Sequence, residues 1–112
     1  GAMQRLQKRI VADLEKATSN NPKLGEAFIL LSQLYKGTDI DKALDAVSRA
    51  IDAFDSQPEK KSDAYVLRAT MQEDDDARFD DLEKAFQTNP KNKQAWLQKI
   101  VLLMQQNRYE EI

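Results

Sequence analysis

The chain is 112 residues long, which is enough for one domain or for one section of a larger one, and its 3 Gly and 3 Pro are few for this length and favour helices. It contains no Cys and no His, which excludes disulfides, Cys/His zinc sites, thiol nucleophiles and imidazole acid-base chemistry. The 17 basic and 19 acidic side chains give a formal charge of −2, which is too balanced for a general nucleic-acid or anionic-membrane surface.

The ends and the apolar runs carry little targeting information. Gly1-Ala2-Met3 is interpreted as a cloning remnant, so the native start and any signal peptide are not readable and no localisation is indicated. The longest apolar runs, Ala27–Leu31 and Ile100–Met104, are far shorter than the roughly 20 residues that cross a bilayer. We therefore predict no membrane span in residues 4–112, which form the predicted domain.

In the first half of the chain, apolar residues recur at spacings of three and four, which predicts three amphipathic helices. The first ends near Pro22. The second runs from about residue 23 to residue 36. A third begins at a cap on Thr38 or Asp39 and ends before Pro58.

The second half repeats this organisation. Residues 59–61 are charged and are expected to form a loop or a frayed first turn, and residues 64–71 carry the apolar face of a fourth helix. The last members of the acidic run 73–76 suit the N-cap and first turn of a fifth helix, which ends at Asn89-Pro90. A sixth runs over about 91–105. No strand alternation is present, so the predicted class is all-α with antiparallel neighbouring helices.

Internal repetition indicates how these helices are arranged. Three segments contain a proline, a spacer, an alanine and an aromatic residue, and they end at Phe28, Tyr65 and Trp96. The aromatic residues are 37 and 31 residues apart, which brackets the roughly 34 of a tetratricopeptide repeat. Upstream of each proline lies a related phrase, and the phrases at 13–17 and 81–85 both read Asp-Leu-Glu-Lys-Ala.

This pattern resembles the tetratricopeptide repeat family of helix-turn-helix arrays. Phe28, Leu31, Ser32 and Tyr35 match the first helix of its motif, and Trp96 begins a further unit. The resemblance implies a right-handed superhelical array of antiparallel helix pairs, an α-solenoid of about six helices. The implied division is a leading half repeat at 4–21, repeats at 22–57 and 58–89, and an incomplete repeat at 90–112.

Some positions depart from the family pattern. The turn after Tyr35 is one residue short, and Arg78 stands where a small residue belongs. Arg68 resembles the variant in which Arg replaces Leu, and we expect it to make an internal ion pair or to pack its stem. Residues 108–111 resemble the start of a second helix.

The resemblance also implies a peptide-binding site, because the first helix of each pair lines a concave groove in this family. The predicted groove residues are Ile29, Gln33, Lys36, Val66, Thr70, Leu97, Gln98 and Val101. Ile29, Val66 and Leu97 occupy equivalent places and would form an apolar strip, unless neighbouring helices cover them. The places that grip a chaperone's terminal carboxylate hold Ile29, Gln33, Leu67, Gln94 and Gln98, so we predict no carboxylate clamp.

Other candidate sites are weak. The acidic run with Asp80 and Asp81 lacks the alternating ligands, the turn glycine and the terminal glutamate of a calcium loop, so a solvated helix start is favoured. The lysine pairs at loops lack interleaved aromatic residues, and no glycine-rich phosphate loop is present. The sequence therefore predicts no enzyme, no metal and no cofactor.

Two function classes remain open: a scaffold that binds a protein or peptide in its groove, and a structural spacer or self-association segment. We expect Leu97, Val101, Leu102 and Met104 to lack partners within the chain, so that Leu102 and Met104 promote homo-oligomers through the solenoid ends. The residues expected to be mostly buried are Phe28, Tyr35, Ala43, Val47, Ala50, Tyr65, Ala69, Leu82, Ala85 and Trp96.

Overall fold

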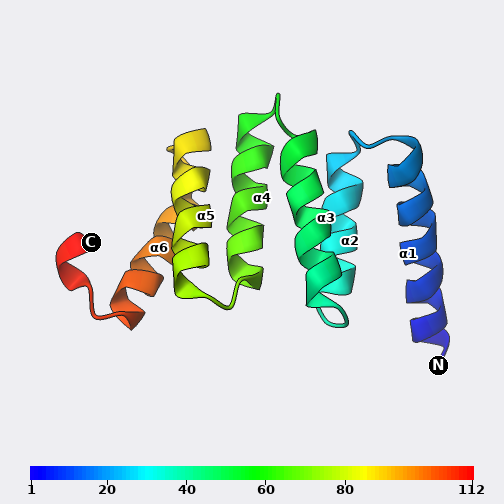
Figure 1. Cartoon of the computed structure of the whole chain (residues 1–112), viewed down its shortest axis with the longest axis horizontal. Coiled ribbons are helices and arrows are strands. Elements are labelled where there is room, and N and C mark those ends of the chain that lie inside the picture. Colours follow the sequence, from blue (N-terminus) through cyan, green and yellow to red (C-terminus); the bar gives the residue numbers. More distant parts are fainter. The chain divides into compact units, whose positions relative to one another are not determined.

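The computed structural model describes all 112 residues and contains only helices, which confirms the predicted all-α class (Figure 1). The elements are α1 Ala2–Asn20, α2 Gly25–Tyr35, α3 Ile40–Ala53, α4 Pro58–Met71, α5 Asp75–Thr88, α6 Lys93–Gln105 and the short 3₁₀ helix η1 Tyr109–Glu111. None of the helices combines the length and the apolar character needed to cross a bilayer.

The chain divides into two compact units. Unit 1 is Gly1–Ser56 and contains α1, α2 and α3, while unit 2 is Gln57–Ile112 and contains α4, α5, α6 and η1. Within each unit, helices that follow one another along the chain pack against one another. This agrees with the expectation of short connections between neighbouring helices.

Unit 1 is built on the close antiparallel pair of α2 and α3. The contact residues of α3 are small or β-branched, and Ala43, Val47 and Ala50 have no exposed surface. Gly25, the first residue of α2, lies directly against the ring of Phe54, and a Cβ added to it would be 2.3 Å from a ring carbon. A residue without a side chain is therefore what lets α2 begin so close to the end of α3.

The long helix α1 packs on α2. Tyr35 at the end of α2 donates its hydroxyl hydrogen to the Glu15 carboxylate of α1. The other long side of α1 is open, and Leu6 and Ile10 remain 52% and 41% exposed there. This helix therefore carries an apolar face that unit 1 leaves uncovered.

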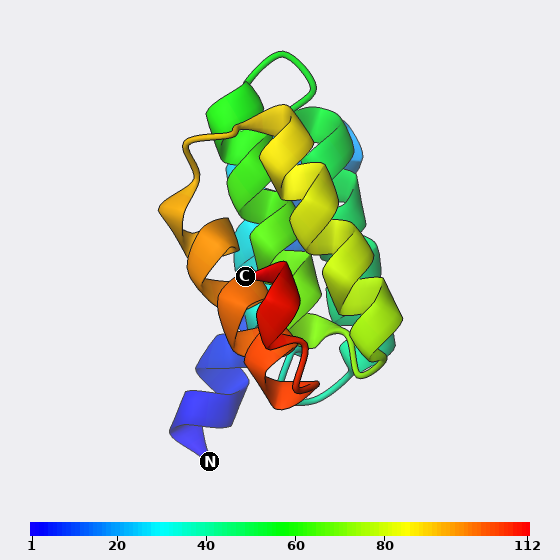
Figure 2. The same cartoon turned by 90° about the vertical axis from the view of Figure 1, so that its left-hand side faces the viewer.

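In unit 2, α4 and α5 form the closest pair, and α6 packs on α5 and also reaches α4 (Figure 2). One cluster of buried side chains joins the three helices: Val66, Ala69, Leu82, Ala85, Ala95 and Leu102. Tyr65, Phe79 and Phe86 pack on this cluster from its edges. All three helices thus share a single core.

Polar caps fix several helix starts. The side chain of Asp39 accepts a hydrogen bond from the Lys42 amide, which decides the open choice between Thr38 and Asp39. Asp74 caps α5 through the Ala77 amide, as the acidic run predicted. Pro58 is the first residue of α4, so the charged residues 59–61 belong to the first turn of the helix and not to a loop.

Two turns of the chain have the same backbone geometry. In the turn Asn21–Leu24 the Asn21 side chain accepts from the Lys23 amide at 3.1 Å, and in the turn Asn89–Asn92 the Asn89 side chain accepts from the Lys91 amide at 3.2 Å. The first residue of each turn is extended, with φ of −141° and −146°. Each turn connects a helix carrying the Asp-Leu-Glu-Lys-Ala phrase to the next helix.

The end of the chain turns back on unit 2. Asn107 adopts a positive φ of 58°, and the amides of Asn107 and Arg108 donate to the carbonyls of Met104 and Leu103, which closes α6 with a Schellman motif. Arg108 then stacks over the Phe79 ring at 5.3 Å, and η1 follows. Residues 108–111, which resembled a helix start, thus provide the N-cap, Arg108, and the three residues of this short 3₁₀ helix.

Candidate functional site

A hollow of about 290 Å³ lies in unit 2 beside the contact between α4 and α6. It is lined by Ala69, Thr70, Arg78, Leu82, Leu97, Gln98, Val101, Leu102 and Gln105, and is called the α4–α6 hollow below. Four of the predicted groove residues, Thr70, Leu97, Gln98 and Val101, are brought together in it. It is the strongest candidate for a binding site.

Apolar side chains from α6 form one wall of this hollow. Leu97 and Val101 are four residues apart on the helix, so they lie one above the other on one face. They are 57% and 51% exposed, whereas Leu102 and Leu82 below them are buried. An apolar group entering the hollow would therefore remove aliphatic surface from water.

Polar side chains form the remaining rim. Thr70 donates its hydroxyl to the Leu67 carbonyl at 2.6 Å, which leaves its oxygen able to accept a hydrogen bond. The side-chain amides of Gln98 and Gln105 also line the hollow and have no hydrogen bond within the chain. Such amides can both donate to and accept from a peptide backbone.

One cation also lines the hollow. Arg78 donates from its Nε to the Gln72 carbonyl at 2.6 Å, and this bond holds the side chain at the end of α4. Sequence reasoning did not name Arg78 as a site residue. The signal was present, since Arg78 had been identified as a large side chain in the place of a small one.

A buried polar network positions α6 next to α4. Asn92, the N-cap of α6, accepts from the Ala95 amide at 3.2 Å and donates to Ser62 Oγ at 2.8 Å and to Asp63 Oδ1 at 3.0 Å. Ser62 in turn donates to the Ala85 carbonyl at 2.7 Å. Because Ser62 and Asn92 are both buried, this network fixes the start of α6 against α4 and the last turns of α5. Sequence reasoning missed it, although an Asn directly before a helix was a visible signal.

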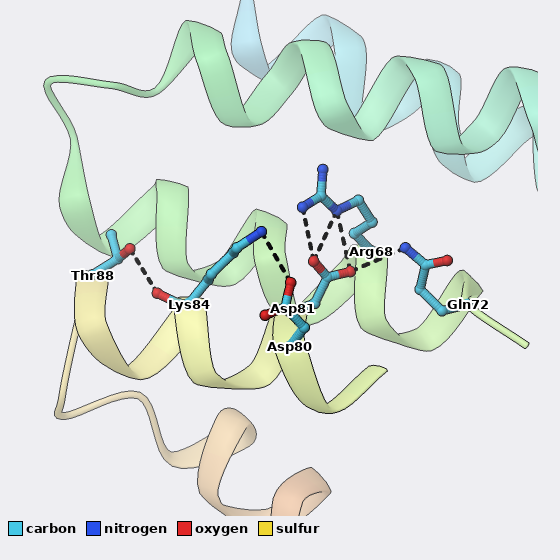
Figure 3. Close-up of polar contacts among 6 residues, drawn as sticks. All are labelled: Arg68, Gln72, Asp80, Asp81, Lys84 and Thr88. Carbon is cyan, nitrogen blue, oxygen red and sulfur yellow. Dashed lines mark hydrogen bonds and ion pairs between the residues drawn. The ribbon is translucent and has the colours of Figure 1, made fainter. Parts of the chain in front are cut away.

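An ion pair holds α4 to α5 near the other end of α4 (Figure 3). Arg68 donates to Asp81 from Nε at 3.1 Å and from its terminal nitrogen at 2.8 Å, and Gln72 donates to the same carboxylate at 3.2 Å. Arg68 also lies over the Tyr65 ring at 5.4 Å. The expected internal ion pair of Arg68 is thus confirmed, and Asp81 is engaged in structure.

The structure contradicts the predictions for two site residues, Val66 and Leu102, because both are buried. Val66 is 7% exposed and belongs to the core of unit 2, so it offers no surface to a ligand. Leu102, expected to lack a partner, is 3% exposed and packs in the same core, whereas Met104 is exposed. Leu102 is buried because α6 is rotated about its axis so that this residue faces α4 and α5.

The same rotation corrects the prediction for Trp96. It was expected to be buried but is 51% exposed, and it packs one side on Phe86 with ring centroids 4.5 Å apart. Tyr35 and Tyr65 are half-buried. The other residues expected to be mostly buried are buried: Phe28, Ala43, Val47, Ala50, Ala69, Leu82 and Ala85.

The three remaining groove residues are in unit 1, where Ile29 and Gln33 are on α2 and Lys36 is its C-cap. Ile29 is half-buried, while Gln33 and Lys36 are exposed. None of them lines the α4–α6 hollow. A joint site with unit 2 remains a prediction.

Unit 1 has a hollow of its own, of about 410 Å³, between α1, α2 and α3. Tyr35 lines it together with Glu15, Lys42 and Arg49. Burial, followed by the hydrogen bond to Glu15, raises the pKa of Tyr35 to about 12. The Tyr35 hydroxyl therefore keeps its proton and acts as a link between α1 and α2.

The carboxylates of the chain form no group of three or more that could hold a metal ion. Comparison with models of known protein families, with curated proteins and with solved structures finds no match for this chain.

Proposed function

We propose that the chain is a non-catalytic protein-interaction scaffold of the tetratricopeptide type, and that the α4–α6 hollow receives an apolar side chain of a peptide or of a partner helix. The observation that carries this proposal is the pair Leu97 and Val101, which lines the hollow while being 57% and 51% exposed. Aliphatic surface gathered in a concave place is typical of a protein-binding site.

The chemistry of the rim suits a polypeptide ligand. Burying two aliphatic side chains contributes about 1.5 to 3 kcal/mol each before the costs of association. The Gln98 and Gln105 amides would bind main-chain groups on either side of the anchoring residue. An extended segment or a helix that presents a Leu-sized side chain next to accessible backbone or side-chain polar groups is the expected ligand.

The internal repeat supports the tetratricopeptide interpretation. The turns Asn21–Leu24 and Asn89–Asn92 are 68 residues apart, which is twice the roughly 34 residues of this repeat. Each follows the same five-residue phrase and has the same hydrogen bonds. We propose no chaperone carboxylate clamp, because the corresponding places lack cations.

The proposal is tested with peptides selected from a displayed random library against the purified chain. When a selected peptide is added, the changes in amide NMR chemical shift should concentrate on residues 69–70 and 97–105. Leu97→Glu or Val101→Glu should abolish binding. Leu30→Glu is the matched control, since Leu30 is 51% exposed on α2 and lies outside the hollow. Equal loss of binding in the control, or shifts confined elsewhere, would contradict the proposal.

The second candidate is a spacer or self-association segment. It is favoured by the exposure of Trp96 and Met104 on α6, which are 51% and 48% exposed. Sedimentation at micromolar concentration separates the candidates. Self-association is supported if the chain forms oligomers that Met104→Glu dissociates and if the library selection yields no binding peptide. A monomer that binds peptides at the hollow supports the scaffold.

A further inference from the structure

The helices α1 and α5 are equivalent by sequence. The phrase Asp-Leu-Glu-Lys-Ala stands at 13–17 in α1 and at 81–85 in α5, with the same spacing to the turn that follows. After each turn, the next helix packs back on its predecessor, as α2 does on α1 and α6 on α5. The surroundings of α5 therefore indicate what α1 is built to contact.

On its second long side, α5 is covered by α4, which is its closest neighbour. Leu82 and Ala85 are buried there, and Asp81 is 2% exposed with Arg68 of α4 bound to both carboxylate oxygens. Ser62 of α4, six residues before Arg68, donates to the Ala85 carbonyl at 2.7 Å. Two polar contacts thus set the register of α4 on α5.

The corresponding side of α1 has no neighbour in unit 1. Asp13, the counterpart of Asp81, is exposed and has no partner within the chain. The Ala17 carbonyl, the counterpart of the Ala85 carbonyl, accepts only from the Asn21 amide. Leu6 and Ile10 continue this side as exposed apolar residues. The two acceptors that receive α4 on α5 are therefore repeated on α1 without an occupant, next to exposed apolar side chains that are particular to α1.

We propose that this side of α1 binds a partner helix of the α4 pattern, an amphipathic helix with a serine and, six residues later, an arginine. The arginine pairs with Asp13, and the serine donates to the Ala17 carbonyl, while Leu6 and Ile10 pack on its apolar face. Arg9 and Lys16 border this side of α1 and favour acidic residues at the flanks of the partner helix. This surface is separate from the α4–α6 hollow and does not depend on the function proposed for it.

The probe is a labelled, end-blocked peptide with the sequence of Pro58–Gln72, whose fluorescence anisotropy is followed as the 112-residue chain is added. A version with a hydrocarbon bridge on its solvent face keeps the peptide helical, so that the cost of helix formation does not hide binding. We expect saturable binding that Asp13→Asn weakens about tenfold or more, as loss of one member of a charged pair in an interface does. Arg68→Gln in the peptide should have the same effect.

The matched control is Asp52→Asn, which removes the same charge from an exposed position on α3 and should leave the affinity unchanged. Asp13→Asn should also leave the thermal unfolding of the chain unchanged, since Asp13 has no partner to lose. A charge reversal, Asp13→Arg in the chain with Arg68→Glu in the peptide, should restore binding that either change alone abolishes.

Three results would overturn the proposal. One is the absence of saturable binding at about 1 mM, near the weakest measurable specific affinity. Another is binding that Asp13→Asn does not weaken, as expected if the peptide displaced α4 from α5. The third is a dimer of the chain alone that Asp13→Asn dissociates, because a second copy would then occupy this side of α1.

Discussion

The turns Asn21–Leu24 and Asn89–Asn92 have the same backbone and differ in their last residue. Leu24 makes no side-chain cap and is 37% exposed, whereas Asn92 is 6% exposed and bonds to the Ala95 amide, Ser62 and Asp63. The first turn only reverses the chain. The second also connects α6 to α4, so one side chain converts a local turn into an anchor for a three-helix unit.

The largest expected effect comes from giving the second turn the residue of the first. Asn92→Leu removes a helix cap and two buried hydrogen bonds, and we expect it to lower the free energy of unfolding by about 2 to 4 kcal/mol. Urea denaturation followed by circular dichroism measures this loss. Leu24→Ala is the control, and a similar small loss for both substitutions would contradict the anchoring role of Asn92.

The residues that follow the two turns provide the next test. Gly25→Ala places a methyl group against the buried Phe54 ring, and the overpacking should cost about 1 to 3 kcal/mol. Its counterpart after the second turn is Lys93, which is exposed, so Lys93→Ala should be nearly neutral. Thermal unfolding of the two variants compares them. Equal melting temperatures would show that the approach of α2 to Phe54 is not a constraint.

Unit 1 has a titratable link between α1 and α2 in place of the Asn92 network. This link is the hydrogen bond from the Tyr35 hydroxyl to Glu15. The pKa of Tyr35 is raised to about 12 in the folded chain from an ordinary 10.0, so the contribution of the link to stability is complete below pH 10 and is lost as the pH rises to about 12. Near neutral pH, Tyr35→Phe should cost about 1 kcal/mol. Denaturation at several pH values should show the difference between wild type and Tyr35→Phe shrinking above pH 10, and a constant difference would argue against this link.

The smallest effect is expected from the reverse exchange. Leu24→Asn gives α2 the cap that α6 has, and it should raise the free energy of unfolding by about 0.5 to 1 kcal/mol. Because position 24 is 37% exposed, the new side chain would otherwise bond to water, so the gain should stay that small. Leu24→Ser should give a comparable gain in urea denaturation. No gain from either variant would indicate that the α2 start is satisfied by other groups.

Much of the helical organisation is predictable from the sequence, because spacing, prolines and caps are local signals. Asp39 and Asp74 cap the helices that their positions suggested, and Asn89-Pro90 ends α5. The rotation of α6 is a different matter. Apolar residues occur on several of its sides, so periodicity does not reveal that Leu102 faces the core while Trp96 faces solvent.

The candidate site was predictable only in part for the same reason. Leu97, Gln98 and Val101 follow from their place on one helix face, and they line the hollow with Thr70. The prediction for Val66 is wrong because small residues around it let α4 and α6 approach closely and bury its side chain. The partners of Asn92, which are Ser62 and Asp63, lie 30 and 29 residues away in the sequence, so a local pattern can suggest the cap but not the network. Arg78 bonds to Gln72 only six residues away, but its place in the hollow depends on how α4, α5 and α6 pack together.

The Asn92 network also affects how unit 2 opens. Detaching α6 would break both hydrogen bonds from Asn92 to α4 and would expose the shared apolar core at the same time, so partial opening has a high free energy. Amide hydrogens of α4, α5 and α6 should therefore exchange with solvent together, through one cooperative event. By contrast, α1 packs less closely on α2 than α3 does and should exchange by a separate, lower-energy opening. The hollow in unit 2 would then keep its shape for as long as that unit is folded.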